Sequence, residues 1–155
     1  MAPAIRTTEQ RISDTVQRLR HDIDAWVATA DTTGAPYLIP LSFLWDGHDL
    51  WLSTAASSQT SRNLLANGRV RLTLGLTRDV VLIEGAVDVL ASDQLSGELG
   101  DAFATKTGFD PRGLTSRYLY FRVTPLRLQA WREENELAER DLFREGQWLV
   151  APPES

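Results

Sequence analysis

The sequence predicts a mainly β (α+β) fold: a small barrel or sandwich of short strands with helices at its periphery. Alternating or wholly apolar segments are separated by turn residues such as Gly34, Pro36 and the Asn67-Gly68 pair. The strands do not alternate regularly with helices, and neither a GxGxxG nor a Walker loop occurs. These observations favour an antiparallel architecture over a doubly wound parallel sheet.

Length and composition predict one globular domain over residues 1–155. The chain is 43% hydrophobic and 24% charged, which is typical of a soluble protein with a full core. It contains neither an apolar run long enough for a bilayer nor an apolar signal segment, so we expect a cytoplasmic protein without a membrane partner. The formal net charge of −5 argues against nucleic-acid binding.

Few side chains could carry chemistry by themselves. The absence of cysteine excludes disulfides, thiolate nucleophiles and zinc–cysteine sites. The two histidines, His21 and His48, have no metal-ligand spacing and should be solvated, so we expect no metal site. If the protein is an enzyme, a cofactor should supply the reaction chemistry.

The first elements are a helix and two strands. Thr7 and Gln10 form a capping-box pattern. Apolar residues then recur at helical spacing, namely Ile12, Val16, Leu19 and Ile23. The strand "AWVATAD" ends at a Gly-Pro turn, and "YLIPLSFLW" follows with Pro40 in its middle. Proline has no N–H to donate to a neighbouring strand, so this second strand should lie at a sheet edge or contain a bulge near Pro40. A simple edge strand and an opening that admits a ligand are equally possible.

The remaining elements follow from similar signals. A hairpin turn "DGHD" leads into "LWLST", a short helix is predicted from about Thr60 to Ala66, and "RVRLTLG" alternates as a strand. The long strand "VVLIEGAVDVL" should bend at Gly85, and a helix should cover roughly residues 92–106. A final strand interrupted by Pro125 precedes "EENELAERD", which is most simply a solvated helical face.

The stretch between "LWLST" and "RVRLTLG" offers the clearest candidate site. It is rich in hydroxyl donors, and a helix N-terminus with unpaired N–H groups attracts anions. Arg62 opposes the helix dipole in the first turn, and a bound phosphate would reverse that cost. The alternative is that Ser58 or Thr60 is only an N-cap and that Arg62 points into water, which the composition alone favours.

Two further candidates are less specific. Glu84 lies in an apolar strand, where it could act as a general acid or pair with an arginine on a neighbouring strand. Trp131 and Arg132 form a planar pair at a strand end, which could stack on a ring or bind an anion. Burial of Trp131 in a core or interface is the alternative.

The order of these elements resembles the pyridoxamine 5′-phosphate oxidase-like superfamily of FMN-binding proteins. The resemblance covers roughly residues 22–132 and rests on four motifs: "GAPYLIPLS", "LWLST", "RNLLANGRVRL" and "VLIEG". It implies a split β-barrel of about six antiparallel strands over residues 24–132, after an N-terminal helix (1–23) and before a C-terminal extension (133–155). The helix and the tail resemble a smaller, oxidase-related, actinobacterial-type branch that uses FMN or deazaflavin.

The resemblance also implies a homodimer with cofactor sites between the subunits, each holding FMN or, alternatively, a deazaflavin coenzyme or haem. Ile39, Pro40, Leu41 and Ser42 would line the cofactor ring, and Ser53 and Thr54 would approach its sugar-alcohol chain. The phosphate would meet Ser58, Gln59, Thr60, Ser61 and Asn63, with Arg62 as a cation. Trp131 and Arg132 would reach the site from the partner subunit.

One departure bears on function. Gln59 and Thr60 stand where the oxidases have an arginine and a lysine, and no histidine follows His48. The leading hypothesis is therefore a flavin- or deazaflavin-dependent oxidoreductase that acts on a small organic molecule by hydride transfer but is not a true pyridoxamine-phosphate oxidase. The alternative is a non-catalytic split-barrel module that binds flavin, deazaflavin or haem, or has lost its cofactor.

Overall fold

A computed structural model gives the fold of residues 3–154. Its framework is one antiparallel sheet in the order β3-β2-β1-β4-β5-β6-β7-β8, and a second pairing of β3 with β6 closes the first six strands into a barrel. The barrel strands are β1 (Asp24–Ala30), β2 (Pro36–Trp45), β3 (Leu50–Ala55), β4 (Arg69–Leu74), β5 (Val80–Ala91) and β6 (Tyr118–Trp131). The predicted mainly β barrel with peripheral helices is confirmed.

The barrel interior is a packed hydrophobic core. On β1 and β4 buried residues alternate with more exposed ones, as the period of two in a strand requires. Side chains from different strands fill the centre, among them the fully buried Phe43, Leu52, Leu72, Ile83 and Phe121. Any ligand site must therefore lie on the outside of the barrel or where its strands separate.

In residues 3–154 three α-helices lie around the barrel: α1 (Thr8–His21), α2 (Gln59–Asn67) and α3 (Gly97–Thr107). The capping box before α1 is present, with the Gln10 backbone N–H 3.1 Å from Thr7 Oγ1, and Gly68 ends α2 in the left-handed conformation. Ile23 lies beyond α1 and is 41% exposed, so its predicted place on the apolar stripe is wrong. None of the described helices is long and apolar enough to cross a membrane.

The predicted helix over residues 92–106 is divided into two elements. A 3-10 turn, η1 (Ser92–Gln94), is followed by α3, because the Ser96 hydroxyl accepts a hydrogen bond from the backbone of Leu99 and starts a new helix. After α3 the chain forms a second 3-10 turn, η2 (Pro111–Gly113), before it enters β6.

The predicted bend at Gly85 is confirmed. The register between β5 and β6 shifts at Glu84 and Gly85, which face Arg127 and Pro125, so β6 carries one extra residue, Leu126, at this point. A side chain at Gly85 would overlap that of Val123, and glycine is therefore required where the two strands approach.

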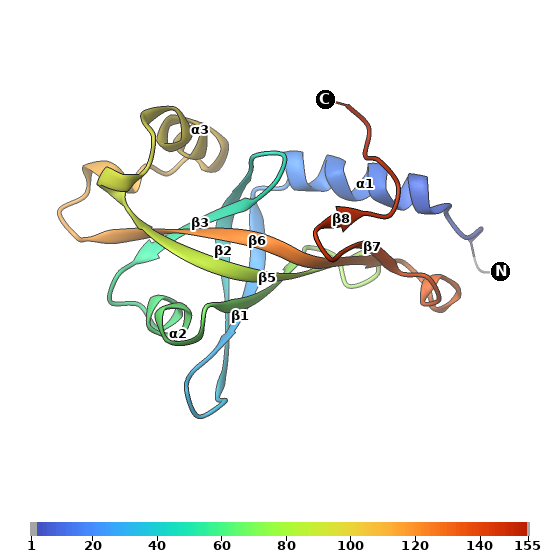
Figure 1. The fold of residues 1–155 in the computed structure, drawn as a ribbon, viewed down its shortest axis with the longest axis horizontal. Coiled ribbons are helices and arrows are strands. Elements are labelled where there is room, and N and C mark those ends of the chain that lie inside the picture. The colour runs from blue at the N-terminus through green and yellow to red at the C-terminus, as the bar shows by residue number, and fades with distance from the viewer. Residues whose placement is uncertain (1–2, 155) are drawn as a thin grey trace.

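The C-terminal extension, residues 133–154, adds η3 (Glu134–Glu136) and two short strands, β7 (Asp141–Arg144) and β8 (Gln147–Trp148), beyond β6. The predicted solvated helix in this segment is wrong: only one 3-10 turn forms, and Glu136 within it is 2% exposed. In Figure 1 the extension and α1 lie at one end of the molecule, and α2 and α3 lie at the other.

Candidate functional site

The barrel is split between β2 and β3. Within the described residues the two strands pair only over Phe43–Trp45 and Leu50–Leu52, and beyond this point β3 pairs with β6 alone. An unbroken ladder would place Ser53 opposite Ser42 and Thr54 opposite Leu41. Residues 39–42, predicted to line the cofactor ring, therefore lie on one side of this split. Ser53 and Thr54, predicted to approach the sugar-alcohol chain of the cofactor, lie on the other side.

The predicted ring-binding residues of β2 do not share one face. Ile39 and Leu41 are half-buried on the side of Phe43, whereas Pro40 on the other side is exposed and the Ser42 hydroxyl donates to Asp24 Oδ1 at 2.6 Å. Residues 39–42 do share an unpaired strand edge. On one side they pair with β1, and on the other side no strand of the described residues pairs with them. The edge predicted from Pro40 is thus present, and it coincides with the split.

The start of α2 forms the other wall, which we call the α2 corner (residues 53–63). Ser58 is the N-cap, because its Oγ accepts the backbone N–H of Ser61 at 3.1 Å. A chain of hydroxyl hydrogen bonds then links Thr54 to Ser58 at 3.3 Å, Ser58 to Ser61 at 3.1 Å, and Ser61 to the carbonyl of Ala55 at 2.7 Å. Ser53 donates to the Leu119 carbonyl at 2.9 Å. These bonds hold the loop before α2 in one shape.

Arg62 does not simply point into water. Its guanidinium folds back to the Ser57 carbonyl and to Gln59 Oε1, the latter at 2.8 Å. The positive charge is thereby held beside the N-terminal end of α2, where the helix dipole is also positive. The first turn of α2 has no acidic residue, and no carboxylate of residues 3–154 forms an ion pair with Arg62. The guanidinium and the positive end of the helix dipole repel each other when no ligand is bound, whereas a bound anion would attract both.

Gln59, Thr60 and Asn63 have mixed roles. Gln59 Nε2 donates to Asn63 Oδ1 at 2.8 Å, and Asn63 Nδ2 donates to Thr29 Oγ1 on β1 at 3.0 Å, which ties α2 to the barrel. Asn63 is 2% exposed and therefore acts mainly as this brace. Thr60 Oγ1 is buried and has no hydrogen-bond partner in the described part of the chain. With one exposed guanidinium and helix N–H groups that have no acceptor in the described residues, the α2 corner fits a single small anion such as a phosphate.

Trp131 and Arg132 lie at the opposite end of β6 from the α2 corner. β6 begins beside Ala55, where Tyr118 is its partner, and Trp131 ends the strand opposite Val80. Arg132 lies 3.4 Å from Asp79 and 3.6 Å from Asp14, and the Arg140 guanidinium lies 5.6 Å from the centre of the Trp131 ring. One chain does not bring this pair to the α2 corner, so their contribution from a partner subunit stays a prediction.

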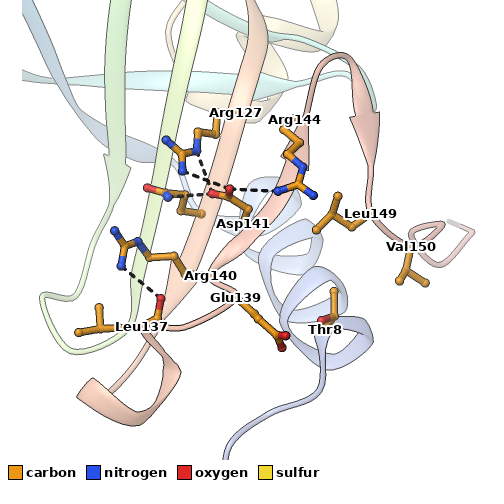
Figure 2. A pocket seen from close by; sticks show the side chains of 10 residues that line it. Thr8, Arg127, Leu137, Glu139, Arg140, Asp141, Arg144, Leu149 and Val150 are labelled. Atoms are coloured by element: carbon orange, nitrogen blue, oxygen red, sulfur yellow. Dashed lines mark hydrogen bonds and ion pairs between the residues drawn. The ribbon is translucent and has the colours of Figure 1, made fainter.

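A second polar region, missed by the sequence reasoning, lies in the C-terminal extension. A hollow of about 650 Å³ is bordered there by three arginines, and Figure 2 shows Asp141 between Arg127 and Arg144. Arg127 Nε and Gln129 Nε2 each donate to Asp141 at 2.8 Å, and the hydrogen bond from Arg127 holds the pKa of Asp141 below its usual value. The sequence does not indicate this cluster, because only the pairing of β6 with β7 brings Arg127 and Gln129 next to Asp141.

Glu84 pairs with an arginine on a neighbouring strand, which was the predicted alternative to a general-acid role. It faces Arg71 across the β4–β5 ladder, with 3.9 Å between Arg71 Nη2 and Glu84 Oε2. Both side chains lie on the outer, solvent-accessible face of the barrel. The structure thus provides Glu84 with a structural role and no contact with the α2 corner.

The fold and this site define a split β-barrel protein with a polar corner at the start of a short helix. A family model described as pyridoxamine 5′-phosphate oxidase matches residues 14–132, and the chain belongs to this family. No curated protein matches the sequence significantly.

Solved structures with the same fold share little sequence with the chain. A protein described as an F420 reductase is 19% identical, with 72% of this chain and 93% of that chain covered and a TM-score of 0.61. A putative pyridoxamine 5′-phosphate oxidase from Listeria innocua is 12% identical, with 79% and 98% covered and a TM-score of 0.63. HutZ, the heme storage protein from Vibrio cholerae, is 16% identical, with 88% and 99% covered and a TM-score of 0.60.

Proposed function

We propose that the protein is a flavin- or deazaflavin-dependent oxidoreductase that acts on a small organic molecule, with FMN as the first candidate cofactor. The observation that carries the proposal is the α2 corner, where Arg62 and a helix N-terminus face outward without a carboxylate. Family membership supports it, and so does a neighbour described as an F420 reductase. Because Gln59 and Thr60 are uncharged, we do not propose true pyridoxamine-phosphate oxidase activity.

Each wall of the split has a role in this proposal. The N-terminal N–H groups of α2 and Arg62 hold the cofactor phosphate, and Ser53 and Thr54 lie along the path from the phosphate to the ring. The unpaired edge of residues 39–42 offers backbone N–H and C=O groups to the polar rim of the ring. When bound, a flavin or deazaflavin supplies the hydride-transfer chemistry that no side chain of the site can supply.

We further propose a homodimer with the cofactor sites between its subunits. The outer face of β1 and β2 exposes Trp26 and Leu38, which are 47% and 59% exposed, beside Pro40. An apolar patch of this kind on adjacent strands is typical of a covered surface. The second subunit would bring Trp131 and Arg132 to the site. Sedimentation velocity should give twice the mass of the chain; a monomer at micromolar concentration would contradict the dimer.

The most direct test is the absorbance spectrum and mass of whatever co-purifies with the protein. We expect the visible absorption of an oxidised flavin or deazaflavin and the mass of that cofactor. Added FMN should also raise the melting temperature, because a ligand at 100 times its Kd stabilises the folded state by about 2.7 kcal/mol. A colourless protein whose melting temperature moves with neither FMN nor deazaflavin would overturn the proposal.

The second candidate function is a non-catalytic module that binds flavin, deazaflavin or haem. The uncharged Gln59 and Thr60 favour it, because they weaken the positive field of the α2 corner. The neighbour HutZ, described as a heme storage protein, shows that the fold alone does not imply catalysis. A coloured protein whose cofactor is reduced by no nicotinamide donor and by no substrate would favour this module over the oxidoreductase.

A further inference from the structure

The segment that enters β6 lies directly beside the α2 corner. The backbone N–H of Ala56 donates to the Arg117 carbonyl at 3.0 Å, and the next residue, Tyr118, is the ladder partner of Ala55. Residues Thr115–Arg117 have the same sequence, Thr-Ser-Arg, as the first turn of α2 at Thr60–Arg62. Two hydroxyl-rich segments that each end in an arginine thus border the loop between β3 and α2.

Arg117 is available for an external ligand. It is exposed, and within the described residues no carboxylate lies within ion-pair distance of it. Arg117 also lines an open hollow of about 300 Å³ next to η1, and Asp93, which lines the same hollow, forms no ion pair with it in residues 3–154. The nearby Arg112 is different, because Asp101 and Asp110 both hold its guanidinium at 2.8 Å.

A phosphate monoester carries more negative charge than one guanidinium neutralises. Such a group carries about −1.5 to −2 charges at neutral pH, and Arg62 supplies a single positive charge at the α2 corner. Arg69 is a poor second cation, because it follows the C-terminal end of α2, about 13 Å from the first turn of a nine-residue helix. Arg117 is connected by a backbone hydrogen bond to the loop that precedes that first turn.

We propose that Thr115–Arg117 forms the second wall of the phosphate site and that Arg117 is its second cation. This inference rests on the proposed function, because it assigns a residue to the same cofactor site. It would also account for a phosphate site in which Gln59 and Thr60 are uncharged: the missing positive charge comes from a different segment of the chain.

The test compares FMN with riboflavin, which differ only in the phosphate, by fluorescence titration of the purified protein. Arg117→Ala should weaken FMN binding roughly tenfold, as expected for loss of one charge-assisted contact, and should leave riboflavin binding within about twofold. Arg117→Lys should restore most of the FMN affinity, and the control Arg69→Ala should change neither ligand. An unchanged melting temperature of each unliganded variant verifies folding.

The outcomes separate this inference from the proposed function. If the wild-type protein prefers FMN to riboflavin and Arg117→Ala keeps that preference, the assignment of Arg117 is overturned and the flavin site stands. If the wild-type protein binds both flavins equally, the phosphate site itself is overturned. If it binds neither flavin nor deazaflavin, the proposed function fails together with this inference. For a protein that prefers the deazaflavin coenzyme, the same comparison uses its phosphate-free deazaflavin core.

Discussion

The C-terminal extension and the α2 corner differ in the groups that their arginine side chains contact. At the end formed by α1 and the C-terminal extension, guanidinium groups meet carboxylates of the same chain, such as Arg6 with Glu136 at 2.8 Å and Arg127 with Asp141 at 2.8 Å. At the α2 corner, Arg62 is held by a carbonyl and an amide oxygen only. Charges neutralised within the chain stabilise the fold, whereas a charge left without a counterion is available to a ligand.

Glu136 is the centre of the neutralised end. Its carboxylate accepts hydrogen bonds from Arg6 Nη2 at 2.8 Å, from the Arg6 backbone at 2.9 Å and from the Arg132 backbone at 2.9 Å. The side-chain hydrogen bond from Arg6 is the main cause that lowers the pKa of Glu136 from 4.5 to about 2. These contacts fasten the N-terminal segment to the C-terminal extension.

The largest effect should follow from Glu136→Gln. The substitution keeps the volume but leaves the largely buried Arg6 without its main counterion, which should lower the free energy of unfolding by about 3 kcal/mol. Urea unfolding followed by circular dichroism measures this loss. Glu134→Gln is the matched control, since Glu134 lies in the same turn but is exposed, and it should change stability by less than about 0.5 kcal/mol. Equal losses in the two variants would contradict this role of Glu136.

The pH dependence provides a second measure of the same contact. Because the folded-state pKa of Glu136 is about 2 and the reference value is 4.5, its stabilisation is fully present above pH 4.5. It is lost as the pH falls from 4.5 through 2, when the folded state must also take up the proton. The stability difference between the wild-type protein and Glu136→Gln should therefore shrink over this window. A difference that stays constant down to pH 2 would show that the carboxylate charge is not involved.

At the open end, Arg62→Ala should act on ligand binding more than on stability. Loss of the guanidinium should weaken FMN binding roughly tenfold, or about 1.4 kcal/mol, because one charge-assisted contact to the phosphate disappears. The stability of the unliganded protein should change by less than about 0.5 kcal/mol, as for other exposed residues. Fluorescence titration and urea unfolding measure the two quantities. The exposed Arg78 is the control; unchanged FMN affinity in Arg62→Ala would count against the phosphate site.

The sequence predicted the parts of the fold that depend on neighbouring residues. The Thr7–Gln10 capping box, the end of α2 at Gly68 and the bend at Gly85 all follow from local geometry, and all are present. The order of the strands was accessible only through the resemblance of motifs to a known family. The same resemblance of motifs predicted that residues 39–42 and the α2 corner contribute to one cofactor site.

Contacts between distant residues were not accessible in this way. Glu136 looked solvated because its local sequence is acidic and polar, and nothing nearby indicates a partner 130 residues away in Arg6. Likewise, the sequence left open whether Arg62 meets a phosphate or points into water, and it did not indicate the bonds of the guanidinium to the Ser57 carbonyl and Gln59 Oε1. Side-chain pairing across a fold depends on strand register, which single-residue patterns do not specify.

The smallest effect compares two helix caps. Ser58 and Ser96 both accept the third backbone N–H of their helices, at 3.1 and 3.2 Å, so alanine at either position should cost about 1 kcal/mol of unfolding free energy. Only Ser58→Ala should also weaken FMN binding, by about two- to threefold, because Ser58 holds the loop beside the phosphate while Ser96 begins α3. Urea unfolding and FMN titration of both variants measure this. If Ser58→Ala loses stability as Ser96→Ala does but keeps its FMN affinity, the hydroxyl chain of the α2 corner serves the helix alone, and the ligand depends only on the cations.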